Sequence, residues 1–237
     1  MSTYVHGSLA LGGFHPRRSD IDVLVIVGDR PPLAAAELKA LGGRLVALPL
    51  VGRGVELSIV TRDAAQRPSA PWPFLLHVTT APDDFKIVVG VDHGGDRDLL
   101  MHYVVTRSAG IVVRGDPPAE TIGPIPRDEI LRYLADELRR AESNAGETYG
   151  VLNAARARCF LADGRIVSKI DGGRAALASE GPNEVLARAL RVQEGHADDR
   201  PLTADATRYV RAVRDQLTAA YTTRRDSLPG GVLERRG

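Results

Sequence analysis

The chain has little cysteine for disulfide bonds, no long apolar run for a membrane span and almost no net charge. It contains one cysteine, Cys159, so no intramolecular disulfide can form, and we expect a protein of the reducing cytoplasm. Lysine and arginine exceed aspartate and glutamate by only 31 to 30, which excludes the strong positive field of a dedicated nucleic-acid binder. No apolar run reaches the length of a membrane span, and the N-terminus lacks the basic and apolar regions of a secretion signal.

Apolar residues are abundant despite the low aromatic content of 5%. They make up 43% of the 237 residues, which is enough for one large domain or two modest ones. The composition changes after Pro117-Pro118, where short strands give way to long helical patterns. We therefore predict an α+β protein with a mixed domain at residues 1–120 and a helical bundle domain at residues 121–237.

The predicted elements follow from hydrophobic periodicity and from the positions of proline and glycine. In the first part, the pattern predicts strands at residues 3–6, 21–27, 44–51 and 54–60, a short strand or helix turn at 85–90, and an apolar segment at 111–115 that closes this half. It also predicts helices up to residue 41, closed by Gly42-Gly43, and at 96–108, with a proline-rich loop at 62–82. In the second part, it predicts helices at 128–143, 147–162, 169–179, 183–195 and 203–224.

A short constellation near the start carries the strongest chemical signal. Gly7-Ser8 forms a turn, and Asp20 and Asp22 follow at the mouth of the aliphatic run 21–27. Residues two apart on a strand point to the same side, with Cα atoms roughly 6.6 Å apart. Two crowded carboxylates repel and favour a hard divalent cation such as Mg²⁺, and a glycine-serine turn can bind a phosphate. The motif therefore indicates a metal-dependent nucleotide site.

A third carboxylate, Glu56, lies on the alternating strand 54–60. Its neighbours Val55 and Leu57 point to the opposite face, so Glu56 lies on the more polar side. If this strand lies beside the aspartate strand, Glu56 joins the pair, since neighbouring strands are about 4.8 Å apart. Three acids around Mg²⁺ suit an in-line displacement at phosphorus, and a carboxylate near a hydroxyl can act as a general base. The six histidines show no metal-ligand spacing, so we do not expect zinc.

Together these motifs resemble the polymerase-β-type nucleotidyltransferase superfamily and, more narrowly, the aminoglycoside (3'')(9) adenylyltransferases. The resemblance covers most of the chain and rests on residues 5–27, 54–60, 97–118 and 151–169. It implies a polymerase-β-like nucleotidyltransferase domain with a small mixed sheet, followed by a helical domain that completes a cleft for ATP and antibiotic.

The resemblance also implies roles for individual residues. Asp20, Asp22 and Glu56 would hold Mg²⁺, and Glu56 would be the catalytic base that deprotonates the drug hydroxyl. The nucleotide would be bound by residues from both halves, namely Gly7, Ser8, Arg156 and Lys169. The implied reaction transfers AMP from ATP to a hydroxyl and releases pyrophosphate, in a cytoplasmic monomer.

Two departures from the family concern the acceptor. Streptomycin-modifying members carry a tryptophan in the segment corresponding to residues 76–85, whereas the only tryptophan here is Trp72. They also carry an aspartate where this chain has Gly146, next to Glu147. We therefore expect spectinomycin to be favoured over streptomycin. Two alternatives remain open: a nucleotidyltransferase that acts on a non-antibiotic metabolite or a protein, and a non-catalytic nucleotide-binding module.

Overall fold

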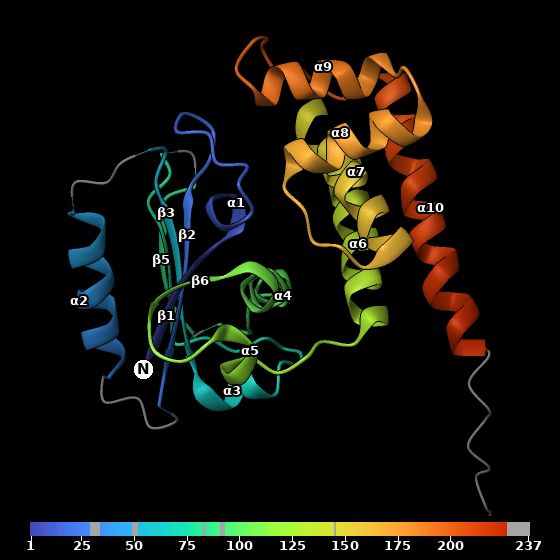
Figure 1. Ribbon diagram of the computed structural model, residues 1–237. Coiled ribbons are helices and arrows are strands. Elements are labelled where there is room, and N and C mark those ends of the chain that lie inside the picture. The colour runs from blue at the N-terminus through green and yellow to red at the C-terminus, as the bar shows by residue number, and fades with distance from the viewer. Residues whose placement is uncertain (29–33, 49–51, 83, 91–92, 145, 227–237) are drawn as a thin grey trace, which may run out of the picture.

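The computed structural model describes residues 1–28, 34–48, 52–82, 84–90, 93–144 and 146–226. Its centre is a six-stranded sheet in the order β5-β4-β3-β2-β1-β6 (Figure 1). The strands are β1 (Ser2–His6), β2 (Ile21–Val27), β3 (Val55–Thr61), β4 (Leu76–Thr79), β5 (Lys86–Val89) and β6 (Ile111–Arg114). β2 and β3 run parallel and all other neighbouring strands are antiparallel, which confirms the predicted mixed sheet.

Helices cover both faces of this sheet. α2 (Ala35–Val46) lies on one face and α4 (Leu99–Ala109) on the other, as Figure 1 shows. Three short helices complete this half, namely α1 (Gly7–Ala10), α3 (Arg62–Gln66) and α5 (Pro118–Thr121). Because α1 follows β1 without a break, the turn at Gly7 lies on the α4 side of the sheet.

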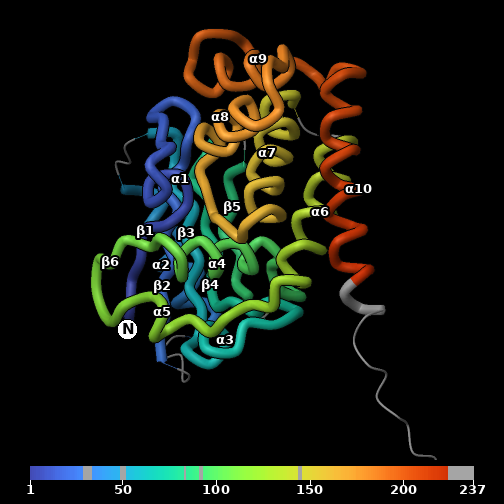
Figure 2. Tube along the Cα trace, turned by 45° about the vertical axis from the view of Figure 1, so that its right-hand side comes forward, coloured from blue at the N-terminus to red at the C-terminus, as the bar shows by residue number. Residues whose placement is uncertain are grey.

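The C-terminal half is helical, as predicted. α6, α7 and α10 lie side by side, with α8 and α9 packed across α7 (Figures 1 and 2). Their bounds, which differ from the predicted ends by at most two residues, are Arg127–Asn144, Glu147–Asp163, Lys169–Glu180, Glu184–Gln193 and Ala204–Asp226 for α6 to α10. Among the described helices, none combines the length and the apolarity that a membrane crossing requires.

One continuous apolar core joins the sheet to the helical half. It includes Tyr4 and Leu24 from the sheet, Tyr103 from α4, Leu131 from α6 and Leu152 from α7, all at most 1% exposed. Close packing of this kind has low compressibility. The two walls of any cavity between the halves are therefore held at a defined separation.

The predicted strand at residues 44–51 is wrong in its described part. α2 continues through Gly42 and Gly43 to Val46, while residues 49–51 lie outside the described residues. A Cβ atom on Gly42 would lie 2.6 Å from Ile87 Cγ2, so this glycine allows α2 to approach β5 closely. Gly42 therefore serves packing, and neither glycine of the pair ends the helix.

The segment 62–82, predicted as a proline-rich loop with short structured pieces, contains the buried strand β4 and the short helix α3. All four residues of β4 are buried, including the polar His77 and Thr79. Its sequence does alternate between apolar and polar residues, but over only four positions inside a proline-rich segment, the shortest run that indicates a strand. Ser58 on β3 compensates the burial of His77, because its hydroxyl lies 3.0 Å from His77 Nδ1.

Candidate active site

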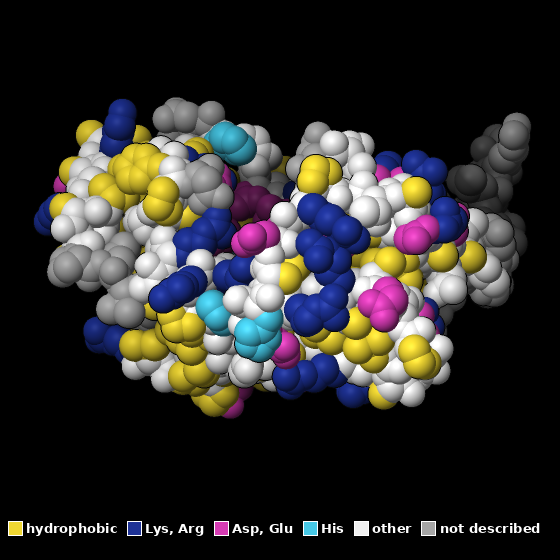
Figure 3. All heavy atoms as spheres, turned by 90° about the horizontal axis from the view of Figure 1, so that it is seen from above, with side chains coloured by type: hydrophobic (Ala, Val, Ile, Leu, Met, Phe, Trp, Pro, Cys, Tyr) yellow, Lys and Arg dark blue, Asp and Glu magenta, His cyan; other side chains and the backbone are white. Residues whose placement is uncertain are grey.

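A cavity of about 400 Å³ separates the sheet half from the helical half. Its lining comes from both halves, with the ends of β1, β2 and β3 and the helix α4 on one side and α6, α7 and α8 on the other. Seen from above, lysine and arginine side chains gather on both sides of the junction between the halves (Figure 3). All predicted site residues line this cavity, namely Gly7, Ser8, Asp20, Asp22, Glu56, Arg156 and Lys169.

The turn after β1 is built around the carboxylate of Asp22. Gly7 has a φ of 59°, in the left-handed region, and a Cβ atom there would lie 1.7 Å from Asp22 Oδ2. Only glycine can adopt this backbone beside that carboxylate without strain. The backbone N–H of Ser8 donates a hydrogen bond to Asp22, and the Ser8 hydroxyl oxygen is buried without a partner among the described residues. The turn thus holds Asp22 and leaves the Ser8 hydroxyl available to a ligand.

The three predicted acids lie on adjacent strands. Asp22 on β2 pairs with Glu56 on β3 in parallel register, and Asp20 directly precedes β2. The pKa of Asp22 is raised to about 6, chiefly by burial; His102 opposes this rise, and the negative charges of Glu56 and Asp20 contribute to it. The negative charge of these carboxylates is not balanced by positive charge at the site, and a bound cation would supply that balance.

The donor set fits a hard divalent cation, although it does not form a complete cage. Within the described ranges, no three Asp, Glu, His or Cys side chains are already grouped closely enough to hold a metal ion. Mg²⁺ typically binds through one or two carboxylates and completes its shell with water and substrate phosphates. Asp20 and Asp22 match that requirement, and Glu56 is the adjacent third carboxylate.

The N-terminus of α8 supplies one cation from the opposite wall. Ser168 caps the helix, because its hydroxyl accepts from the backbone N–H of Asp171 at 3.1 Å, and Lys169 is the first helical residue. A Cβ atom on Gly13 would lie 2.6 Å from Ser168 Cβ, so this cap packs directly against the loop after α1. Burial, together with the charge of Arg156, lowers the pKa of Lys169 to about 8. Its ammonium group lies 5.0 Å from the centre of the Tyr149 ring.

A second cation, Arg156, comes from α7. Its guanidinium donates to Asn153 Oδ1, and burial lowers its pKa from the ordinary arginine value. The nearby Arg158, two positions along the chain, forms an ion pair with Glu180 at 2.6 Å and does not line the cavity. The structure therefore brings Arg156, and not Arg158, to the carboxylates.

Aromatic and acidic side chains on α4, α6 and α7, which no sequence motif predicted, form another wall of the cavity. The Tyr133 hydroxyl donates to Asp98 Oδ1 at 2.8 Å, and the Tyr149 hydroxyl donates to Glu137. His102 on α4 also lines the cavity, where its Nε2 lies 3.5 Å from Glu56 Oε1. The spacing of these residues in the sequence is consistent with this wall. Each of the sets Asp98/His102, Tyr133/Glu137 and Tyr149/Asn153/Arg156 has the spacing that places its members on one face of a helix.

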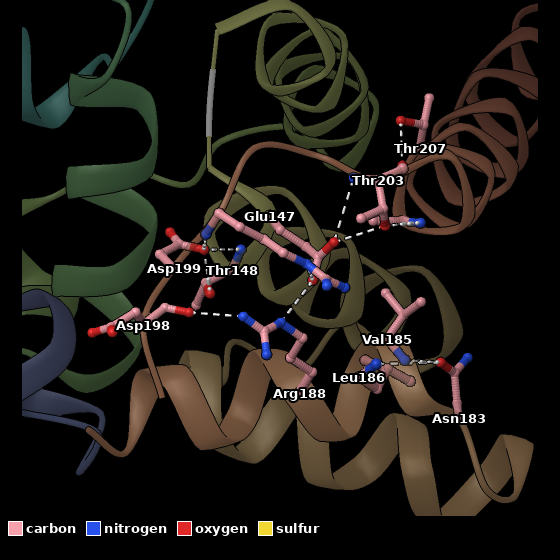
Figure 4. A network of polar contacts seen from close by, with 12 residues as sticks. Glu147, Thr148, Asn183, Val185, Leu186, Arg188, Asp198, Asp199, Thr203 and Thr207 are labelled. Carbon is pink, nitrogen blue, oxygen red and sulfur yellow. Dashed lines mark hydrogen bonds and ion pairs between the residues drawn. The ribbon is translucent and has the colours of Figure 1, made fainter. Parts of the chain in front are cut away.

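The acceptor contact of the family was expected at Gly146 and Glu147, but Glu147 belongs to a network inside the helical half (Figure 4). Glu147 is 1% exposed and accepts hydrogen bonds from Arg200 Nε at 3.0 Å and from the Thr203 hydroxyl at 2.7 Å. A Cβ atom on Gly146 would lie 2.4 Å from Asp199 Oδ2. A side chain at position 146 is therefore excluded unless Asp199 moves, and Glu147 faces away from the cavity.

The Glu147 network gives a stability prediction. Glu147→Gln loses the charge of a buried acceptor, so we expect the free energy of unfolding to fall by about 1–3 kcal/mol. Activity per folded molecule should change by less than about twofold, because Glu147 does not line the cavity. Urea unfolding and a turnover assay measure the two effects. Asp205→Asn, at an exposed ion pair with Arg208, is the matched control and should be near neutral. A large fall in turnover with unchanged stability would contradict this structural role.

Comparisons with known proteins agree with this architecture. Residues 2–71 match the nucleotidyltransferase domain model, and residues 120–221 match the model of the C-terminal domain of aminoglycoside adenylyltransferases. Among solved structures, the chain is similar to spectinomycin adenyltransferase AAD(9) from Enterococcus faecialis, whose crystal structure contains ATP and spectinomycin. The TM-score is 0.68 at 19% identity, over 92% of this chain and 91% of that one. No curated protein sequence matches the chain.

The two family models account for both halves in the order in which the fold presents them. The sheet half carries the turn and the acids expected of a nucleotidyltransferase, and the helical half carries the cations that complete the cavity. The chain belongs to the aminoglycoside adenylyltransferase family of the nucleotidyltransferase superfamily and is an enzyme of that type.

Proposed function

We propose that this enzyme transfers AMP from Mg²⁺-ATP to a hydroxyl of an aminocyclitol or aminoglycoside antibiotic, with spectinomycin favoured over streptomycin. It would act as a cytoplasmic monomer, with a nucleotidyltransferase domain at residues 1–120 and a helical domain at 121–237. The observation that carries the proposal is the meeting of Asp20, Asp22 and Glu56 with Arg156 and Lys169 around one cavity.

The donor side of the reaction follows from the charges of the lining. Gly7 and Ser8 would bind the triphosphate through the turn, and the buried Ser8 hydroxyl would find its partner there. Lys169 and Arg156 would bind the phosphates from the opposite wall and offset the charge that develops on the departing pyrophosphate. These contacts would orient the α-phosphate toward Glu56.

Asp20 and Asp22 would hold Mg²⁺, with Glu56 as the adjacent third carboxylate. When bound, the metal would polarise the phosphoryl oxygens and stabilise charge at phosphorus. Glu56 would accept the proton of the acceptor hydroxyl as its oxygen forms a bond to the α-phosphorus. The bond between the α-phosphorus and the bridging oxygen breaks, and pyrophosphate leaves.

The acceptor side favours a cationic, polyhydroxylated molecule. Asp98 and Glu137 line the cavity beside Tyr133 and Tyr149, and their carboxylates would attract protonated amines. The aromatic rings offer apolar faces against which a compact ring system can pack. An aminocyclitol combines these properties, since it carries amines and hydroxyls on a saturated ring.

Two features support spectinomycin as the preferred acceptor. The chain's single tryptophan, Trp72, is 6% exposed in the apolar core and does not line the cavity. Gly146 packs against Asp199, so the position where the family carries an aspartate presents no side chain. Both contacts that the family resemblance associates with streptomycin are therefore missing. The similar solved structure is itself a spectinomycin adenyltransferase.

We expect Lys169 to lower the stability of the ATP-free protein and to strengthen ATP binding. Its pKa is lowered to about 8, so the folded protein disfavours the charged form. The destabilisation is present below pH 8 and fades as the pH rises toward the ordinary lysine value. Lys169→Met should therefore stabilise the ATP-free protein at pH 7 by about 1 kcal/mol and weaken ATP binding about tenfold or more.

Thermal unfolding without nucleotide and calorimetric titration with ATP measure these two effects. Lys39→Met, at an exposed position on α2, is the control and should change neither quantity. An unaltered affinity for ATP in Lys169→Met would contradict the role of Lys169.

A susceptibility panel tests the proposed function. Expression in a sensitive bacterium should raise resistance to spectinomycin and leave sensitivity to streptomycin unchanged. Resistance to neither drug, combined with transfer of label from radioactive ATP into protein or into another metabolite, would favour the alternative acceptors. Mg²⁺-dependent ATP binding without turnover on any acceptor would favour a non-catalytic nucleotide-binding module.

A further inference from the structure

A pair of buried histidines lies directly beside the acid row. His6 on β1 pairs with Asp22 in the sheet register, and Asp22 pairs in turn with Glu56, so the three side chains share one face of the sheet. α4 crosses this face (Figure 1) and carries His102. The His102 ring lies 4.9 Å from the His6 ring, centre to centre, and its Nε2 lies 3.5 Å from Glu56 Oε1.

Among the described residues, the polar side chain that His102 faces is that of Glu56. Its side chain is 15% exposed, and that of Glu56 is 28% exposed. Within the described parts of the chain, His102 Nδ1 is buried without a hydrogen-bond partner, as is Nε2 of the neighbouring His6. The remaining ring nitrogen of His102, Nε2, is the one that faces Glu56. At 3.5 Å the contact is longer than an ordinary hydrogen bond, and because a carboxylate only accepts, a hydrogen bond between the two groups requires the proton on Nε2.

We propose that His102 is a positioning residue that donates its Nε2–H to Glu56 Oε1 and fixes the orientation of this carboxylate. The inference rests on the proposed function, in which Glu56 accepts the proton of the acceptor hydroxyl. A carboxylate side chain at the mouth of a cavity can rotate about its last torsion, which leaves its two oxygens free to exchange. With Oε1 held by His102, the other oxygen stays directed at the acceptor hydroxyl.

The packing of His102 supports this role. Asp98, one turn earlier on α4, accepts from the Tyr133 hydroxyl of α6, so this face of α4 is tied to the helical half. The His6 ring packs on the other side of His102 and limits its rotation. Catalytic groups need such support, because a misplacement of about 1 Å can cost roughly 100-fold in rate.

Three substitutions separate hydrogen bonding from shape. His102→Gln keeps an N–H near the position of Nε2, His102→Asn keeps the amide on a shorter side chain, and His102→Phe keeps the ring without a donor. We expect His102→Gln to retain kcat within about threefold, and the other two to lose about 30-fold or more, with the KM values for ATP and spectinomycin changed less than about threefold. Equal kcat in the Gln and Phe variants, or wild-type kcat in the Phe variant, would overturn the proposal.

A spectroscopic measurement tests the contact without turnover. Nitrogen-15 NMR of the imidazole rings should show His102 as the Nε2–H tautomer, with a ring-nitrogen shift that changes in Glu56→Gln. The Nδ1–H tautomer, or a spectrum unaltered by Glu56→Gln, would overturn the proposal even if the His102 variants failed to fold. If the wild-type enzyme transfers no AMP to any aminocyclitol while this contact is present, the proposed function fails and the pairing of His102 with Glu56 stands.

Discussion

Glu56→Gln is expected to lower kcat for AMP transfer by about 10²–10⁴-fold, because glutamine cannot accept the proton of the acceptor hydroxyl. Glu56 is only partly buried and lies in register with Asp22, so an isosteric amide should leave the sheet intact. The affinity for ATP should change much less than kcat, since in the proposed function the turn, Lys169 and Arg156 would contact the triphosphate. Pyrophosphate release gives kcat, and calorimetry gives the dissociation constant.

Glu120→Gln controls for the loss of a carboxylate as such. Glu120 is exposed on α5, away from the cavity, and its substitution should leave kcat unchanged. A kcat for Glu56→Gln within about threefold of wild type would contradict general-base catalysis by this residue.

The second large effect is expected at Gly7, where Gly7→Ala should abolish most activity and destabilise the protein. The new Cβ would lie 1.7 Å from Asp22 Oδ2, so either the turn or the carboxylate must move. A displaced Asp22 would no longer face Asp20 and Glu56, and a shift of about 1 Å at a reacting centre can cost roughly 100-fold in rate. Turnover and urea unfolding of the purified variant measure both effects.

Gly12→Ala is the matched control for backbone strain. Gly12 has a φ of 71°, close to the 59° of Gly7, but a Cβ atom there would meet nothing within 4 Å. Both variants should therefore lose about 1 kcal/mol to the left-handed backbone, and only Gly7→Ala should also lose activity. Similar turnover in the two variants would show that the approach of Gly7 to Asp22 has no role in catalysis.

The local part of the fold could be predicted from the sequence. The aliphatic run at 21–27 and the alternation around Glu56 mark β2 and β3, and the five C-terminal helices follow from their apolar spacing. The parallel register of Asp22 with Glu56 confirms the expectation that these acids would meet. β4 is hard to predict because its alternation spans only four residues within a proline-rich segment, and the end of α2 is hard to predict because Gly42 serves packing.

The residues of the opposite wall depend on how the halves dock, which no local pattern encodes. Arg156 and Arg158 are equally plausible in sequence, and only the contact of Arg158 with Glu180 separates them. His102 belongs to no motif, and its place beside Glu56 follows from the crossing of α4 over the sheet. Tyr149 and Glu137 meet only because α6 and α7 pack together.

The most direct test of the central claim is mass spectrometry of spectinomycin incubated with the purified enzyme, ATP and Mg²⁺. We expect a spectinomycin–AMP adduct and a matching release of pyrophosphate, both lost in Glu56→Gln and both much weaker with streptomycin. Unmodified spectinomycin after prolonged incubation with folded, ATP-binding enzyme would contradict the central claim.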